Sequence, residues 1–571
     1  MTTDSSSPAL DRRRVLGLGV TGAALGFAQG GNAVAETATS AAPAGAAARG
    51  TGIPTPTPVV ETNAGRVQGL VIDGVCHFCG VRYGAAPIGP LRWAPPQPAP
   101  AWKGIYDASD FGAPAMQLAS GTSVDTANDF GFQMHRVFTT PSELKVMNED
   151  CLYLNVWTPA PDGKKRPVMV WIHGGGYAYG SGSQPIYQCD GLARAGDVVA
   201  VSVNHRLNVF GYLHLGDLMG PEFATSGTVG MQDLVLALQW VRDNIAAFGG
   251  DPGNVMIMGQ SGGGAKVSTL LAMPSAKGLF HKAAIQSGPG LTVGHKGPAT
   301  EAARKLLDAL GVKPGDIAAL RTLPAPTILA AAAKVNGAGF GGVGSGPILD
   351  EVVITRDPFT PDAPDVSADV PILIGWAKDE WTIFSAGEPW FGRMTEDDLQ
   401  ARIKPFGESG QRLLAAYRQA YPAYSPTYLW IQMVSGRVML GSEAIAARKT
   451  AKGAAPAYVY MVAWETPVEG GVFKTPHTME IPFMLYSYDK VRTFVGEGPG
   501  PGHMADVIGG AWVAFARTGK PDHPGVPHWP AFNTTERPVM VFDTQSRVVD
   551  DPLPGVRQVL ETLPQALMLR G

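Results

Sequence analysis

A serine set between closely spaced glycines is the residue of this chain best placed to act as a nucleophile. Ser261 follows the strand-like apolar run 254–258 and precedes an expected helix over residues 265–273. A strand, a sharp turn and a helix in this order form a nucleophile elbow, in which Gly259 and Gly263 leave room for strained backbone angles at the serine. The helix would also aim N–H groups at the place where negative charge develops. The segment predicts acyl-transfer chemistry at Ser261, with an ordinary glycine–serine turn as the alternative.

A glycine run upstream could bind the oxyanion that forms when a serine attacks a carbonyl carbon. The strand-like segment 168–172 leads into a glycine triplet whose backbone N–H groups no side chain covers. Gly175 and Gly176 can then donate to the same oxygen as the N–H of Gly262. A glycine-rich hairpin without this role is the alternative.

A carboxylate and a histidine should follow the serine in that order, which is characteristic of α/β hydrolases. Of the 11 histidines, His477 is the best placed to act as the base. Between serine and histidine, the buried strand-like run 370–375 leads into a loop that carries Asp379 and Glu380. Loops at the carboxyl ends of parallel strands assemble such sites, so either carboxylate could orient the imidazole.

Together these segments resemble type-B carboxylesterases, the family that includes bacterial esterases, mammalian carboxylesterases and cholinesterases. Besides the elbow, the motifs that carry the resemblance lie at residues 65–69, 90–96, 148–155, 204–206, 244–252, 512–521 and 529–530. The family implies an α/β-hydrolase fold, with a large, twisted, mostly parallel central sheet flanked by helices and a small N-terminal antiparallel sheet.

The resemblance also implies a role for each site residue. The nucleophile falls on Ser261, the acid on Glu380 rather than Asp379, the base on His477, and the oxyanion donors on Gly175, Gly176 and Gly262. The implied function is hydrolysis of carboxylic esters through a Ser-His-Glu triad and an acyl-enzyme intermediate, with no organic cofactor. We expect no metal site, because the near-match of a zinc motif at His477 and Glu480 lacks a second histidine at helical spacing.

The chain departs from the family pattern at several positions. Gln260 and Gly262 stand where the elbow usually has glutamate and alanine, although a backbone donor at Gly262 needs no side chain. Met116 stands where many members have a cysteine, so we expect Cys151 to lack that disulfide partner. Pro141 stands where cholinesterases have a tryptophan that holds a quaternary ammonium, which argues against choline esters.

Four cysteines, Cys76, Cys79, Cys151 and Cys189, allow several disulfide pairings, which export would permit without requiring. Cys76 and Cys79 lie in a strand-like run, where three steps span about 10 Å, too far for a mutual disulfide. We expect this pair to be core thiols rather than a redox or metal site, because neither a helix start nor a second ligand pair accompanies them.

The N-terminus resembles a bacterial twin-arginine signal peptide covering residues 1–35, so we expect a periplasmic or extracellular protein. Its apolar stretch of about 14 residues is shorter than the roughly 20 that span a bilayer, which predicts no stable membrane insertion. Residues 36–58 are predicted to be a flexible linker and residues 59–565 the catalytic domain. A net charge of −4 without long basic runs excludes nucleic acid as a partner.

The expected substrate is a small ester with an apolar acyl or alcohol part. Aromatic segments at 132–138, Phe340, 381–384 and 390–391 are candidates for the pocket, and each is equally plausible as core or lid. The glycine-rich segment 336–346 is either a gate or a surface loop. Alternative functions are acyl transfer, amide hydrolysis, or a non-catalytic role on the same fold; oligomeric state and the natural ester are not predicted.

Overall fold

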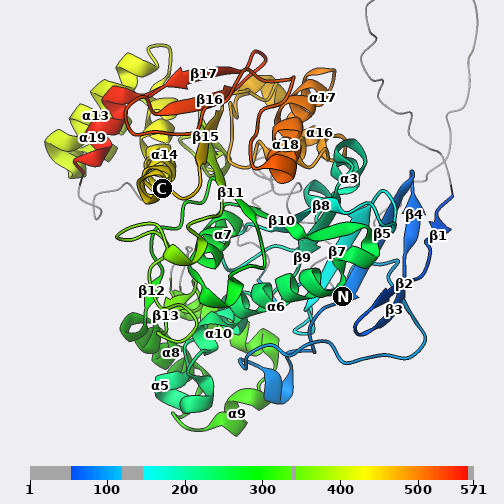
Figure 1. Cartoon of the computed structure of the whole chain (residues 1–571). Coiled ribbons are helices and arrows are strands. Elements are labelled where there is room, and N and C mark those ends of the chain that lie inside the picture. Colours follow the sequence, from blue (N-terminus) through cyan, green and yellow to red (C-terminus); the bar gives the residue numbers. More distant parts are fainter. Residues whose placement is uncertain (1–52, 119–145, 337–341, 564–571) are drawn as a thin grey trace, which may run out of the picture. The chain divides into compact units, whose positions relative to one another are not determined.

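A twelve-stranded sheet, parallel in its middle, forms the centre of the protein (Figure 1). The computed structural model describes residues 53–118, 146–336 and 342–563. In order across the sheet, the strands are β1 (Thr55–Pro56), β4 (Leu70–Ile72), β5 (Val75–Arg82), β7 (Tyr153–Thr158), β9 (Val199–Val203), β8 (Arg166–Ile172), β10 (Gly250–Gln260), β11 (Lys282–Gln286), β14 (Ile372–Ala377), β15 (Ala457–Val462), β16 (Pro538–Phe542) and β17 (Arg547–Asp550). Every neighbouring pair from β9 to β16 is parallel, and the pairs toward both edges are antiparallel. This is the mostly parallel sheet of the expected α/β-hydrolase fold.

Side chains along β8 alternate between two hydrophobic cores, one on each face of the sheet. Val168, Val170 and Ile172 belong to one core, whereas Met169 and Trp171 belong to the other. Both sets are fully buried. Parallel strands that helices cover on both faces bury both rows of side chains, which explains the continuous apolar run in the sequence.

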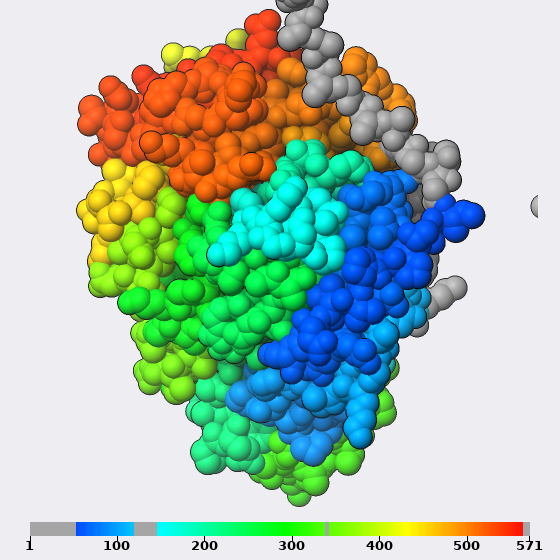
Figure 2. All heavy atoms as spheres, turned by 45° about the vertical axis from the view of Figure 1, so that its right-hand side comes forward, coloured from blue at the N-terminus to red at the C-terminus, as the bar shows by residue number. Residues whose placement is uncertain are grey.

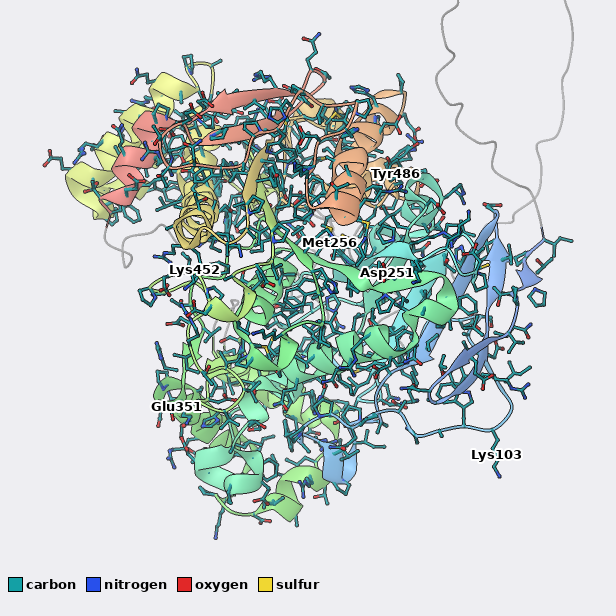
Figure 3. All side chains as sticks on the ribbon, in the orientation of Figure 1. Lys103, Asp251, Met256, Glu351, Lys452 and Tyr486 are labelled. Carbon is teal, nitrogen blue, oxygen red and sulfur yellow. The ribbon has the colours of Figure 1, made fainter. Side chains whose placement is uncertain are left out.

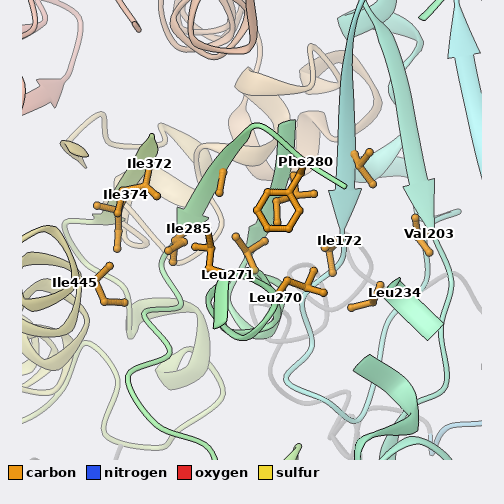
Figure 4. Close-up of a cluster of buried hydrophobic side chains, with 14 of the residues drawn as sticks. Ile172, Val203, Leu234, Leu270, Leu271, Phe280, Ile285, Ile372, Ile374 and Ile445 are labelled. Carbon is orange, nitrogen blue, oxygen red and sulfur yellow. The ribbon is translucent and has the colours of Figure 1, made fainter. Parts of the chain in front are cut away.

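Helices supply the other half of each core. They are α3 (Asp190–Gly196), α4 (Asn208–Gly211), α5 (Gly216–Met219), α6 (Val229–Asn244), α7 (Gly262–Ala272), α8 (Lys296–Leu310), α9 (Ile317–Thr322), α10 (Ala325–Asn336), α11 (Thr382–Ser385), α12 (Glu396–Ile403), α13 (Gly407–Ala420), α14 (Pro426–Lys452), α15 (Ile481–Met484), α16 (Arg492–Val495), α17 (Gly500–Met504), α18 (Gly510–Thr518) and α19 (Pro554–Glu561). Leu234 of α6, Leu270 of α7 and Ile445 of α14 pack in the first core (Figure 4). Leu192 of α3 and Trp512 of α18 pack in the second. The expected helix at 265–273 is α7, and it begins one residue after Ser261.

Charged side chains in this interior are few. Figure 3 shows Met256 within the sheet, where it is fully buried, and Lys103 extending from the margin, where it is exposed. Arg206 and Asp233 are buried as an ion pair, with 2.7 Å between Nη2 and Oδ1. Lys266 is also fully buried, but no carboxylate pairs with it among the described residues.

The expected small N-terminal sheet consists of β2 (Val60–Thr62), β3 (Gly65–Gln68) and β6 (Ile105–Asp107). β2 and β3 pair antiparallel as expected, and β6 joins β3 in parallel. The long connection from β3 to β6 lets the chain return in the same direction. A further two-stranded sheet pairs β12 (Gly294–His295) with β13 (Ile348–Leu349). In Figure 2 the N-terminal segment (blue) lies beside the segment that contains β7 (cyan), in agreement with the pairing of β5 and β7.

The central sheet includes residues before 59, which lie inside the range 36–58 predicted for the linker. Thr55–Pro56 forms β1. The N–H of buried Thr57 donates to the carbonyl of Gly69 (3.0 Å), and the N–H of Gly69 donates to Oγ1 of Thr57 (3.0 Å). These bonds hold the segment against the sheet. Gly50–Gly571 forms one compact unit, whereas the predicted signal peptide at 1–35 lies outside the described residues. No helix within the described ranges has the length and apolar character needed to cross a bilayer.

The four cysteines are buried free thiols. Cys76 and Cys79 both lie on β5 and are not joined, as expected. Burial raises the pKa of Cys79 to about 12, which suppresses the reactive thiolate. Cys151 has no disulfide partner, in agreement with the methionine at position 116.

Candidate active site

Ser261 lies at the tip of the turn between β10 and α7, in a conformation that few non-glycine residues adopt. Its φ and ψ are 59° and −125°. Such a conformation is unfavourable by about 1–3 kcal/mol and persists only where the surroundings enforce it. The Ser261 N–H donates to the carbonyl of Gln286 (2.8 Å), and the Ser261 carbonyl accepts from the N–H of Ala265 (3.1 Å). The strained residue of the predicted elbow is therefore the serine itself.

Close backbone contact explains the glycines on either side of this serine. A Cβ atom at Gly259 would lie 2.5 Å from the carbonyl atoms of Gly263, and a Cβ atom at Gly263 would collide with the carbonyl oxygen of Ile172. Neither glycine has a positive φ. The reason for glycine is thus the close approach of β8, β10 and α7 around Ser261.

The hydroxyl of Ser261 is free. The residue is half-buried, and its Oγ has no hydrogen-bond partner in the part of the chain that the structure describes. Because α7 begins at the next residue, the N–H groups of its first turn have no partner within the helix, and the positive end of its dipole lies at Ser261.

Glu380 and His477 form a buried hydrogen-bonded pair. Oε2 of Glu380 bonds with Nδ1 of His477, while Oε1 accepts from the N–H of Ala377 (2.8 Å). The N–H of His477 also donates to the carbonyl of Glu380 (3.3 Å). The carboxylate has no exposed surface, and the imidazole is 7% exposed. This pairing fixes the proton on Nδ1 and leaves Nε2 of His477 as an acceptor.

Asp379, the other carboxylate that the sequence left open, points to a different set of partners. It accepts hydrogen bonds from Tyr424 Oη (3.0 Å), Gln432 Nε2 (2.7 Å) and the N–H of Thr475 (3.2 Å). Burial raises its pKa, and nearby Lys378 opposes that shift. Asp379 therefore ties the loop after β14 to α14 and to the segment before His477.

The glycine triplet after β8 forms a turn with free backbone donors. Gly175 and Gly176 have φ values of 82° and 60°, in the left-handed region that favours glycine. The carbonyl of Gly175 accepts from the N–H groups of Ala178 and Tyr179 (3.2 and 3.1 Å). The N–H groups of Gly175 and Gly176 have no acceptor among the described residues. They are available to an anionic oxygen.

Gly262 lies against this turn so closely that a side chain has no room. A Cβ atom at Gly262 would collide with Cα, C and O of Gly176. This contact gives a steric reason for the departure from the family's usual alanine. It also brings the third predicted oxyanion donor next to the other two.

Lys266 contacts the residues on both sides of this glycine turn. Its Nζ donates to the carbonyl of His173 (3.1 Å) and lies 5.4 Å from the ring centre of Tyr177. Burial lowers the pKa of Lys266 to about 7. Because the lysine lies on α7, the hydrogen bond links the helix that follows Ser261 to the strand end that carries the glycines.

A second carboxyl, Glu480, is buried near the pair of Glu380 and His477. Its Oε1 lies 3.4 Å from Tyr460 Oη, and its Oε2 has no hydrogen-bond partner among the described residues. Burial, and then the negative charge of Glu380, raise the pKa of Glu480 to about 7. No group of three or more His, Cys, Asp or Glu side chains in the described ranges could hold a metal ion.

Of the predicted pocket aromatics, Phe384 and Trp381 lie at this site. Phe384 is 43% exposed, and its ring centre lies 5.2 Å from that of His477 and 5.0 Å from that of Trp381. Phe391 instead stacks on Phe473 at 6.4 Å, and Trp390 packs under Arg402. The segment 132–138 and residues 337–341 of the predicted gate, which include Phe340, lie outside the described residues.

Sequence reasoning predicted no contact for three polar neighbours of this site. Lys266 and Glu480 interrupt apolar runs, which is a recognisable signal of a buried charge, but it names no partner. Gln260 was visible only as a departure from the family pattern. In the structure its side-chain Nε2 lies 3.0 Å from Nε2 of His477.

The sequence matches the carboxylesterase family over residues 56–554, which is most of the chain. The chain belongs to the carboxylesterase family. Among curated members it is 32% identical to the para-nitrobenzyl esterase of Bacillus subtilis over 507 residues, covering 88% of this chain and 98% of the relative. It is 35% identical over 504 residues to the phenmedipham hydrolase of Pseudarthrobacter oxydans, and the match covers 86% of this chain and 96% of the relative.

Solved carboxylesterases have the same architecture. The carboxylesterase of Geobacillus stearothermophilus aligns with a TM-score of 0.75 at 38% identity, covering 88% of this chain and 99% of that structure. An esterase of Clostridium hathewayi aligns with a TM-score of 0.72 at 32% identity. This carboxylesterase is therefore a carboxylic ester hydrolase with the α/β-hydrolase fold.

Proposed function

We propose that this carboxylesterase cleaves small carboxylic esters through a covalent acyl-enzyme at Ser261, with His477 as the base and Glu380 as the acid. The contact of Glu380 with Nδ1 of His477 is the observation that carries the assignment. A buried carboxylate on Nδ1 fixes one tautomer and leaves Nε2 to accept the serine proton. The strained conformation of Ser261 supports the choice of nucleophile.

Acylation begins when Ser261 Oγ bonds to the ester carbonyl carbon and its proton moves to Nε2 of His477. The electron pair of the carbonyl bond moves onto the oxygen. The oxyanion accepts hydrogen bonds from the N–H groups of Gly175, Gly176 and Gly262. When the intermediate collapses, the bond to the alcohol oxygen breaks, and that oxygen takes the proton from Nε2 and leaves.

Deacylation repeats these steps with water as the nucleophile. His477 takes a proton from water, the hydroxide adds to the acyl carbon, and Ser261 Oγ leaves with the proton that returns from Nε2. Glu380 stays ionised throughout and stabilises the imidazolium.

The preferred substrate carries an apolar group beside the nucleophile. Phe384 supports this proposal, since it is a large exposed aromatic ring in contact with His477. The name of one relative, para-nitrobenzyl esterase, refers to an ester with an aromatic alcohol part. An aromatic or aliphatic group of this kind would bury its surface against Phe384 and Trp381.

Hydrolysis of a para-nitrophenyl ester by the full chain tests the proposal. We expect steady release of para-nitrophenol that Ser261→Ala abolishes and that Ser275→Ala, at an exposed serine shortly after α7, leaves unchanged. Hydrolysis that persists in a folded Ser261→Ala protein would refute the assignment of the nucleophile.

We also propose that the chain is exported through its N-terminal signal and cleaved after Ala35. The arginine-rich motif, the apolar stretch and the small-residue site in residues 1–35 support this. Protein recovered outside the cytoplasm should have the intact mass of residues 36–571, and replacement of Arg12, Arg13 and Arg14 by lysine should retain it inside. Uncleaved protein confined to the cytoplasm would contradict export.

A further inference from the structure

Gln260, the residue before Ser261, contacts the reactive nitrogen of His477. The two Nε2 atoms are 3.0 Å apart, and both side chains are buried. Because Nδ1 of His477 is engaged by Glu380, Nε2 carries the lone pair and the amide of Gln260 is the donor.

Gln260 and Ser261 therefore compete for one acceptor. A neutral imidazole nitrogen has a single lone pair in the plane of the ring, so His477 Nε2 cannot accept well from two donors at once. In this structure Gln260 occupies it, and Ser261 Oγ has no partner among the described residues. The backbone of both donors is held in place, because Gln260 pairs with Gln286 at the end of β10 and the Ser261 N–H bonds to the carbonyl of Gln286.

We propose that Gln260 is a positioning residue that occupies Nε2 of His477 in the resting enzyme and must release it before Ser261 can transfer its proton. This inference rests on the proposed function, since it requires His477 to be the base. The hydrogen bond keeps the imidazole aligned in the absence of substrate. It also lowers the reactivity of Ser261 until the amide turns away.

The amide has a second effect, on the protonated form of His477. An imidazolium carries N–H at Nε2, which would face the N–H of Gln260, so the observed amide orientation favours the neutral ring. Glu380 and Glu480 are the acidic groups around His477. The positive charge of Arg437, on α14, interacts electrostatically with Glu380. The negative charge of Glu380 favours the imidazolium, whereas Glu480, whose pKa burial raises to about 7, is largely neutral at acidic pH. Gln260 therefore opposes the effect of Glu380 at the nitrogen where the proton is exchanged.

Variants at residue 260 separate this role from simple packing. Gln260→Met keeps the size of the side chain and removes the donor, whereas Gln260→Glu keeps the shape and adds a carboxylate. Gln232→Met, on α6, is the control, because that amide contacts Thr225 and Thr228. The concentration of reactive serine in each protein is measured by titration with a fluorophosphonate. Rates are divided by that concentration, so a misfolded fraction does not lower them.

Two readouts are expected to change. At the pH of maximal activity, Gln260→Met should raise the rate constant for phosphonylation of Ser261 about 2- to 10-fold, since one neutral hydrogen bond no longer competes. The acidic limb of the kcat/KM profile should move to higher pH in Gln260→Met and further, by about 1 pH unit or more, in Gln260→Glu. Gln232→Met should match the wild type in both.

An unchanged or slower phosphonylation in Gln260→Met, or an acidic limb at the same pH in the wild type, Gln260→Met and Gln260→Glu, would overturn the inference. These outcomes differ from failure of the proposed function, which would appear as hydrolysis by the wild type that Ser261→Ala does not abolish. A wild type whose hydrolysis depends on Ser261, with no response at residue 260, would remove the competing role of Gln260 alone.

Discussion

Glu380 and His477 are joined twice, once through their side chains and once through their backbones. Oε2 of Glu380 bonds with Nδ1 of His477, and the His477 N–H donates to the Glu380 carbonyl. The loops after β14 and before α15 are thereby fixed to each other. The imidazole has little freedom to change its tautomer or its orientation, which suits the role of general base that we propose for His477.

Replacing Glu380 by glutamine is therefore expected to lower kcat by about 10³- to 10⁴-fold, because an amide no longer fixes the tautomer or stabilises the imidazolium. Thermal unfolding should show that the protein remains folded. A loss of less than tenfold in the rate of steady-state ester hydrolysis would mean that Glu380 is not the carboxylate of the triad.

The neighbouring Asp379 provides the matched control for that experiment. Its carboxylate accepts from Tyr424, Gln432 and Thr475, and it does not bond to His477. Asp379→Asn should lower the free energy of unfolding by about 1–3 kcal/mol, because a buried acceptor set is disturbed. Its kcat should fall far less than that of Glu380→Gln, and an equal fall would contradict the separation of the two carboxylates.

A methyl group at position 262 should damage both stability and rate. In Gly262→Ala the new Cβ collides with the backbone of Gly176, so the glycine turn or the start of α7 must shift. We expect destabilisation by about 1–3 kcal/mol in urea unfolding, and a fall in kcat because the oxyanion donors move apart.

Gly555→Ala serves as the control for this substitution. Gly555 lies in the first turn of α19, and a Cβ atom there would meet nothing within 4 Å. Alanine is the better helix former, so stability should stay the same or rise by up to about 1 kcal/mol. If both variants behaved alike, crowding against Gly176 would not be the reason for the glycine at 262.

Glu480 should make the protein less stable as the pH rises from about 4.5 to about 7. Its pKa is raised from an ordinary 4.5 to about 7, so the folded state keeps a proton that the unfolded chain loses in this range. The unfolded state binds fewer protons there, and the free energy of unfolding falls, by about 3 kcal/mol over the whole window. Above pH 7 both states are ionised at this residue and its contribution stays constant.

Urea unfolding of the wild type and Glu480→Gln at pH 5 and pH 7.5 measures this contribution. The glutamine variant should gain stability relative to the wild type on going to the higher pH. A difference between the two proteins that does not change with pH would show that Glu480 is already ionised in the folded state.

The nucleophile elbow and the sheet around it could be predicted because their signals are local. The run before Ser261 is apolar and is followed by glycines, and the structure explains both by burial in β10 and by contact with Gly263 and Ile172. The resemblance to carboxylesterases extended this local prediction to most of the chain.

Contacts between distant segments were not predictable in the same way. Asp379 and Glu380 are adjacent in sequence, and only the path of the loop after β14 decides which one meets His477. The bond from Gln260 to His477 joins residues 217 positions apart. The range predicted for the linker includes strand β1, because Thr55 and Pro56 pair with β4 and Thr57 bonds to Gly69, and so short a strand leaves no alternating pattern in the sequence.

The most direct test of the central claim is to trap the acyl group on Ser261. The full chain is mixed with a para-nitrophenyl ester, quenched in acid within the first turnover, and analysed by intact mass and peptide mapping. The account predicts one acyl group on the peptide that contains Ser261, and none on Ser261→Ala. An acyl group on another residue, or turnover with no covalent adduct, would contradict it.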